Sequence, residues 1–108
     1  MASSKEYLDF ILEQLSGLED ISWWGMMGEF IIYYRGRIAG GIYDDRLLVK
    51  PVNAARELMP GAEEELPYEG AKPMLLVDNV DSREFLTGLF TKMYPELPES
   101  RPKKPKKG

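Results

Sequence analysis

Apolar residues near the start of the chain recur with the spacing of one helical face. They are Leu8, Ile11, Leu12, Leu15 and Leu18. Ser3 and Glu6 stand in a capping-box arrangement, or Ser4 caps the helix one residue later. Gly17 is placed to end the helix in a left-handed conformation. The pattern therefore predicts an amphipathic N-terminal helix.

From residue 21 onward, β-branched and aromatic residues interrupted by glycine replace the helical period, which is typical of strands. Arg35-Gly36 and Asp44-Asp45 are tight-turn signals of hairpin length. Because such short connections force neighbouring strands to run antiparallel, the strands should form a meander. The four expected strands are Ile21–Met27, Glu29–Tyr34, Arg37–Tyr43 and Arg46–Lys50.

The second half of the chain predicts two helices and one further strand. Asn53–Met59 is expected to form a short helix with its first residue as the cap. Residues 61–71 contain three consecutive glutamates and are typical of a solvated loop. Pro73–Val77 is almost wholly apolar, so this strand should lie inside the sheet or be covered on both faces. A capping box at Asp81 opens a final helix that reaches about Tyr94.

These elements define the fold class as α+β. We expect an antiparallel meander sheet of about five strands, with the N- and C-terminal helices packed on one face. Residues 1–98 should form one domain and residues 99–108 a disordered basic tail. A chain of 108 residues is long enough to bury one core without disulfides.

The composition removes much of the usual catalytic chemistry. The chain has no cysteine and no histidine, so it lacks a thiolate, the usual general base and the commonest transition-metal ligand. No glycine-rich phosphate-binding motif occurs. We therefore expect a protein that is not an enzyme and that binds no cofactor or metal. Neither a signal peptide nor a membrane-spanning apolar run is visible, which favours a cytoplasmic location.

The net charge of −4 hides an uneven distribution of charge along the chain. The last eight residues, RPKKPKKG, carry five of the 14 basic residues, which leaves 9 basic residues against 18 acidic ones elsewhere. An acidic body disfavours binding to nucleic acid. We therefore expect at most a weak, salt-sensitive contact of the tail with nucleic acid, and no membrane partner.

One family resemblance covers roughly residues 4–97. The stretches MMGEFIIYY from Met26, IAGGI from Ile38 and LLVK ending at Lys50 resemble the N-terminal domain of the TfoX/Sxy family. The second half of that domain is matched by Leu66-Pro67-Tyr68 and by Lys72-Pro73-Met74. Two departures are Trp24-Gly25, where the family usually has an arginine, and Glu29, which replaces a glycine. The resemblance does not extend to the separate C-terminal domain of the family.

The resemblance implies a small regulatory domain. TfoX-like proteins are associated with the regulation of natural competence, in which they act with a cyclic-AMP receptor-type activator at promoters. By this likeness, the chain would act by contact with another protein, and a transcription regulator is the implied partner.

Strand alternation indicates where such a contact would lie. In one assignment, the core side takes Ile21, Trp23, Ile31 and Tyr33. The opposite side then takes Trp24, Phe30, Ile32 and Tyr34. An exposed face of this kind is typical of a protein contact or of self-association, here a homodimer through this face or an edge strand. Base stacking by single-stranded nucleic acid and internal cover by the second helix or the acidic loop are the alternatives.

The alternative function is a small-molecule-binding or enzymatic domain with a pocket between the sheet and the helices. Its candidate residues are Glu29, Tyr33 and Tyr68. For Glu29, the competing interpretation is a cross-strand ion pair with a nearby arginine or lysine. The pair Gly40-Gly41 either lets a ligand or another backbone approach the strand closely, or marks a bulge or the point where a helix packs against the sheet.

Overall fold

The sheet is built from six strands, and every neighbouring pair is antiparallel. This computed structural model describes residues 4–26, 29–67 and 69–97. The strand order across the sheet is β1-β2-β3-β4-β6-β5. The strands are β1 (Ile21–Met26), β2 (Glu29–Tyr34), β3 (Arg37–Ile42), β4 (Leu47–Val49), β5 (Glu64–Glu65) and β6 (Met74–Leu76).

The first four strands form the predicted meander, and the α+β fold class is confirmed. The apolar strand β6 lies between β4 and β5, as its composition predicts. The predicted tail, residues 99–108, lies outside the described residues, as does Tyr68. No helix in the described ranges has the length and apolarity needed to cross a membrane.

Two hairpin turns follow directly from local chemistry. Arg35 and Gly36 join β2 to β3 with φ of 53° and 83°, and Asp44 and Asp45 join β3 to β4 with φ of 56° each. Two successive left-handed residues are the mark of a type I′ turn, whose twist matches that of the flanking strands. Both turn predictions are confirmed.

The helices begin close to the predicted positions, but the caps differ. Helix α1 (Lys5–Gln14) is capped by Ser4, whose hydroxyl accepts a hydrogen bond from the Tyr7 amide at 3.1 Å. Gly17 does not adopt a left-handed conformation, and Asp20 takes that role before β1 with φ of 59°. The prediction for Gly17 was therefore wrong. Helix α1 ends before Gly17, and the left-handed residue between this helix and β1 is Asp20.

Helix α3 (Arg83–Met93) is capped by Ser82 rather than by the predicted Asp81. The Ser82 hydroxyl accepts a hydrogen bond from the Phe85 amide at 3.2 Å, which satisfies a free donor of the first turn. The predicted capping box was one residue out of register.

Helix α2 (Asn53–Leu58) is capped by a residue that lies far away along the sequence. Asn53 is the first helical residue, and no side chain of the preceding Val52 caps the helix. Instead, the Glu96 carboxylate, which belongs to the 3₁₀ helix η1 (Tyr94–Glu96), accepts a hydrogen bond from the Ala54 amide at 2.8 Å. The predicted Asn53 cap is therefore wrong, and the C-terminal segment supplies the missing acceptor.

The predicted solvated loop of glutamates is partly a strand. Glu64 and Glu65 pair with Leu75 and Met74 as the edge strand β5. Each carboxylate also meets an arginine, at 2.7 Å for the Glu65–Arg46 pair and 3.2 Å for the Glu64–Arg56 pair. Short, charged edge strands resist pairing with other chains, so the acidic run suits this position.

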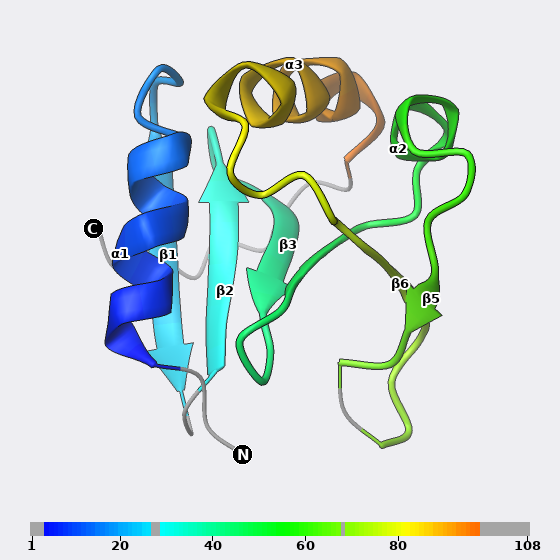
Figure 1. The fold of residues 1–108 in the computed structure, drawn as a ribbon, viewed down its shortest axis with the longest axis horizontal. Helices are drawn as coiled ribbons and strands as arrows, with labels where there is room; N and C mark the ends of the chain where they lie inside the picture. Colours follow the sequence, from blue (N-terminus) through cyan, green and yellow to red (C-terminus); the bar gives the residue numbers. More distant parts are fainter. Residues whose placement is uncertain (1–3, 27–28, 68, 98–108) are drawn as a thin grey trace.

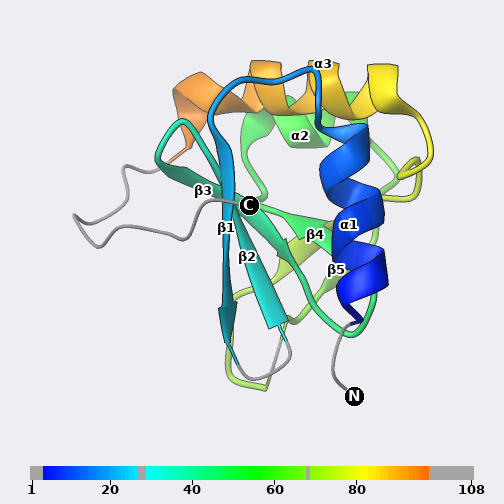
Figure 2. The same cartoon turned by 90° about the vertical axis from the view of Figure 1, so that its left-hand side faces the viewer.

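The helices cover one face of the sheet. Figure 1 shows α1 in front of β1 and β2, with α3 running across one end of these strands. In Figure 2, turned by 90°, α1 and the β1–β2 pair form separate layers and α3 crosses above them. The core between these layers is a single cluster, and its fully buried side chains include Leu8, Ile11, Leu15, Ile32, Ile42, Leu86, Leu89, Phe90 and Met93. Burying each such side chain stabilises the fold by about 1.5–3 kcal/mol.

The assignment of β2 to the two faces was wrong. Ile32 is 0% exposed and Tyr34 is 7% exposed, and both belong to the helix-covered core. Their neighbours Ile31 and Tyr33 point to the other face, because successive side chains on a strand alternate. Both sets are apolar, so the sequence pattern of β2 does not distinguish them; the docking of α1 and α3 does.

Candidate functional site

The sheet face opposite α1 and α3, which we call the open face, carries its own apolar cluster. Tyr43, Leu48 and Met74 are buried there and pack with Leu76, separately from the main core. Leu48 on β4 and Met74 on β6 alternate with the core residues Val49 and Leu75, which explains why they point away from the helices.

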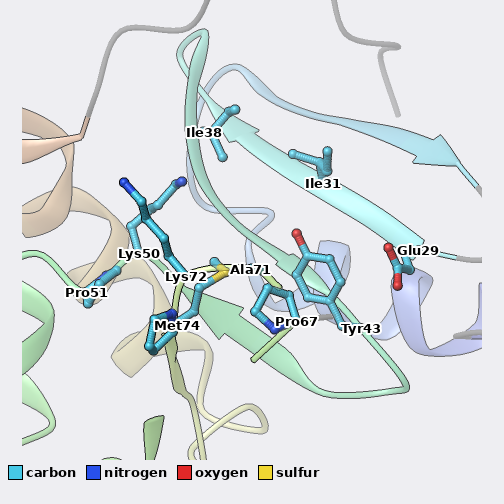
Figure 3. A pocket seen from close by; sticks show the side chains of 11 residues that line it. Glu29, Ile31, Ile38, Tyr43, Lys50, Pro51, Pro67, Ala71, Lys72 and Met74 are labelled. Carbon is cyan, nitrogen blue, oxygen red and sulfur yellow. The ribbon is translucent and has the colours of Figure 1, made fainter. Parts of the chain in front are cut away.

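A cavity of about 440 Å³ opens on this face. This volume lies within the range of small-molecule sites, roughly 300–1,000 Å³. Figure 3 shows side chains from β2, from β3, from the residues just after β3 and β4, and from the loop before β6 converging on it. Its lining is Glu29, Ile31, Ile38, Tyr43, Lys50, Pro51, Pro67, Ala71, Lys72, Pro73 and Met74.

The loop of residues 66–73, which joins β5 to β6, forms one wall of the cavity. It enters the fold through Pro67, which is buried, and leaves it at Met74, whose partner across the ladder is Glu65. Arg46 holds Glu65 by an ion pair of 2.7 Å, with both side chains about one-third exposed. The position of this wall therefore depends on the β5–β6 hairpin.

Tyr43 enters the cavity because Gly41 has no side chain. A Cβ built on Gly41 would lie 2.7 Å from both the ring and the hydroxyl oxygen of Tyr43. The ring thus lies directly over the backbone of β3, where any larger residue would displace it. The Phe30 carbonyl oxygen of β2 would also lie 2.7 Å from this Cβ, so both the Tyr43 ring and the neighbouring backbone require glycine at position 41.

The first glycine of the pair has a packing role. A Cβ on Gly40 would meet the Leu48 carbonyl oxygen at 2.1 Å and the Val49 Cα at 2.8 Å, both backbone atoms of β4. The register between β2 and β3 shifts here, at Ile32/Tyr33. Gly40 therefore lies where another backbone approaches closely, beside an irregularity in the β2–β3 ladder, and the expectations of a close backbone and of a bulge are both confirmed here.

Three charged side chains line the cavity: Glu29, Lys50 and Lys72. Within the described residues, none of their charged groups forms an ion pair or a side-chain hydrogen bond. The expected cross-strand ion pair of Glu29 is therefore wrong, since this carboxylate faces the cavity instead of a basic neighbour. All three charges remain available to a ligand.

The predicted partner-binding residues do not share one surface. Trp24 pairs with Ile31 across β1 and β2 and therefore lies on the open face. Ile32 and Tyr34 are in the core, and Phe30 packs against it with its ring 5.7 Å from the ring of Trp23, edge to face. The predicted surface was wrong because the side chains of β2 point to the opposite faces from those predicted. Of the four residues, only Trp24 is placed to contact a partner.

The alternative pocket was placed on the wrong side of the sheet. The space between sheet and helices is filled by the main core, and the cavity lies on the open face. Glu29 lines it, Tyr33 does not, and Tyr68 is outside the described residues. The sequence pattern did not indicate Lys50 and Lys72, which come from two separate segments that meet only at the cavity. The spacing Gly41-x-Tyr43 is the one local signal that could have indicated the cavity.

The fold and the cavity define a small α+β domain with a preformed, partly apolar pocket. No family model matches the chain, and no solved structure matches it. The chain is 30% identical over 107 residues to the uncharacterized 12.7 kDa protein in the trpE 5′ region of Spirochaeta aurantia, an alignment that covers 98% of this chain and 93% of that protein. The chain therefore belongs to the same family as this spirochaete protein.

Proposed function

We propose that this protein is a non-catalytic binding domain and that its binding site is the cavity on the open face. The observation that carries this proposal is the set of charges in the cavity. Glu29, Lys50 and Lys72 converge on a largely apolar hollow, and none of them forms an ion pair with another residue that the structure describes. A preformed apolar pocket with a few convergent polar groups is the usual form of a small-molecule site.

The proposal that the domain is non-catalytic is supported by its ionisable groups. The sequence has no histidine and no cysteine. Glu29 is the carboxylate that lines the cavity, and the two lysines supply positive charge rather than a proton acceptor. This set suits charge complementarity with a ligand better than general acid–base chemistry.

The test compares ligand binding by the wild-type protein with ligand binding by a variant in which a large side chain fills part of the cavity. Ala71 lines the cavity, so an Ala71→Trp variant should fill part of it. We expect compounds that shift the amide NMR signals of residues around the cavity in the wild-type protein to lose this effect in the variant. Glu57→Trp, on the exposed surface of α2, is the matched control and should bind as the wild type does. Equal binding by all three proteins would refute the proposed site.

A second function, regulation by protein contact, is favoured by Trp24. This indole lies on the open face beside Ile31, so an apolar surface continues from the cavity wall towards the edge strand β1. The TfoX-like motifs of the sequence make a cytoplasmic transcription regulator the proposed partner. Trp24→Ala should abolish such a contact, whereas Leu58→Ala, an exposed apolar residue on α2, should leave it intact. Light scattering of the purified protein would separate a second copy of this chain from a different partner.

A further inference from the structure

We infer that the ligand of the open-face cavity is an elongated organic zwitterion, with an anionic group at one end, an ammonium group at the other and an apolar body between them. This inference deepens the proposed function and depends on it. It rests on where the charged side chains lie around the cavity.

The anionic end of the ligand belongs at the two lysines. Lys50 follows β4, and Lys72 comes from the loop before β6, so two separate elements bring their ammonium groups to one end of the cavity. Figure 3 shows both side chains at this end, away from Glu29. Two like charges at one site repel each other, and an anion between them removes that repulsion. A carboxylate is the simplest group that meets this requirement.

The ammonium end belongs at Glu29. In the ladder between β2 and β3, Phe30 pairs with Ile42, so Glu29 lies one residue further on, beside Tyr43. The Lys50 amide, in contrast, donates to the Ala39 carbonyl at 2.9 Å. Four residues of β3 separate these two levels, which corresponds to about 13 Å along the strand. The backbones that carry the opposite charges therefore lie at opposite ends of the cavity, and among the described residues no ion pair joins Glu29 to Lys50 or Lys72.

The wall between the two ends is apolar. Ile31 and Ile38 line it from β2 and β3, and the Tyr43 ring and Met74 line it from below in the view of Figure 3. A second charge in the middle of a ligand would lose its water here without gaining a partner. The body of the ligand should therefore be an alkyl chain or a flat ring, with charges confined to its ends.

Five octyl compounds test the inference, because they have one apolar body and different end groups. They are octanol, octanoate, octylamine, ω-amino-octanoate and the dicarboxylate suberate. With the full chain in a calorimetric or NMR titration, ω-amino-octanoate should bind best, and octanoate should bind about fivefold to tenfold more weakly. Suberate should bind more weakly than octanoate, because its second carboxylate would face Glu29.

Charge-neutralising variants assign each end. Glu29→Gln should remove the preference for ω-amino-octanoate over octanoate while leaving octanoate binding unchanged. Lys50→Gln combined with Lys72→Gln should remove the preference for octanoate over octanol. Lys92→Gln, on the exposed surface of α3, is the matched control and should leave the order of affinities unaltered.

Two results would overturn the inference, and they differ in what they say of the binding site. If octanol binds as tightly as the charged compounds and the variants do not change the order, the cavity remains a binding site but the zwitterion is wrong. If no compound binds and Ala71→Trp changes nothing, the proposed function fails as well. The predicted order of affinities, with each preference lost only in the variant at the corresponding end, supports both.

Discussion

Gly40→Ala should strongly destabilise the protein, because β3 and β4 touch at this position. The added Cβ would lie 2.1 Å from the Leu48 carbonyl oxygen and 2.8 Å from the Val49 Cα. Both are backbone atoms, so no side-chain rotation relieves the overlap and β4 itself must move. Gly40 pairs with Val49 in the ladder, so this movement also weakens neighbouring hydrogen bonds.

The magnitude follows from these two effects. Overpacking of a well-packed site costs about 1–3 kcal/mol, and one or two weakened ladder hydrogen bonds cost about 1 kcal/mol each. We therefore expect a loss of about 3–4 kcal/mol in the free energy of unfolding, out of about 5–15 kcal/mol for a typical domain. For a chain of this length, the melting temperature should fall by roughly 15 °C.

Urea unfolding followed by tryptophan fluorescence measures the effect, since the chain contains two tryptophans. The matched control is Gly88→Ala, at a helical position in α3 where a Cβ meets no atom within 4 Å. Alanine is the better helix former, so this variant should gain up to about 1 kcal/mol. A Gly40→Ala protein within about 0.5 kcal/mol of the wild type, the range of a neutral surface substitution, would refute the close contact of β3 and β4.

Three further predictions concern contacts between distant segments. Glu96→Ala should lower the free energy of unfolding by about 1 kcal/mol, because it removes the acceptor for the Ala54 amide at the start of α2; circular dichroism during thermal unfolding measures this, and an unchanged melting temperature would contradict it. Arg46→Met should destabilise the protein by up to about 1 kcal/mol by breaking the partly exposed pair with Glu65, and the difference from the wild type should shrink in high salt; a difference that is independent of salt would point instead to the hydrogen bond that Arg46 donates to the Tyr43 carbonyl at 3.2 Å. Burial, and then the nearby Asp45 charge, raise the pKa of Tyr7 above its usual 10.0. The folded state therefore binds the proton of the Tyr7 hydroxyl more tightly than the unfolded state does. The resulting contribution of Tyr7 to the free energy of unfolding is fully present below pH 10.0 and is lost as the pH rises towards the folded-state pKa. Wild type and Tyr7→Phe unfolded in urea from pH 8 to 11 should therefore diverge only in the upper part of this range, where the wild type loses more stability.

The sequence by itself determined the features that depend on a few neighbouring residues. Gly36 and the pair Asp44-Asp45 readily adopt the left-handed conformations of hairpin turns, and the two-residue connection imposes the same conformation on Arg35. These turns fix the antiparallel meander. The apolar period of the first helix and the apolar composition of β6 likewise placed both elements correctly.

Tertiary structure decided which side of each strand became the core. Ile31 and Ile32 are equally apolar, and a period of two has no preferred face when both sets of side chains are hydrophobic. The packing of α1 and α3 buried Ile32 completely and left Ile31 on the open face. This single choice reversed the predicted partner surface and moved the pocket to the other side of the sheet.

The cavity and the cap of α2 could not be read from local sequence for the same reason. Glu96 reaches the Ala54 amide across 42 residues, a contact that no helix-start signal contains. Lys50 and Lys72 share one end of the cavity only because the β5–β6 hairpin folds its loop over β3. Residue type fixed the turns and the helical period, whereas long-range packing fixed the site, because a pocket is made of side chains that are neighbours in space and not along the chain.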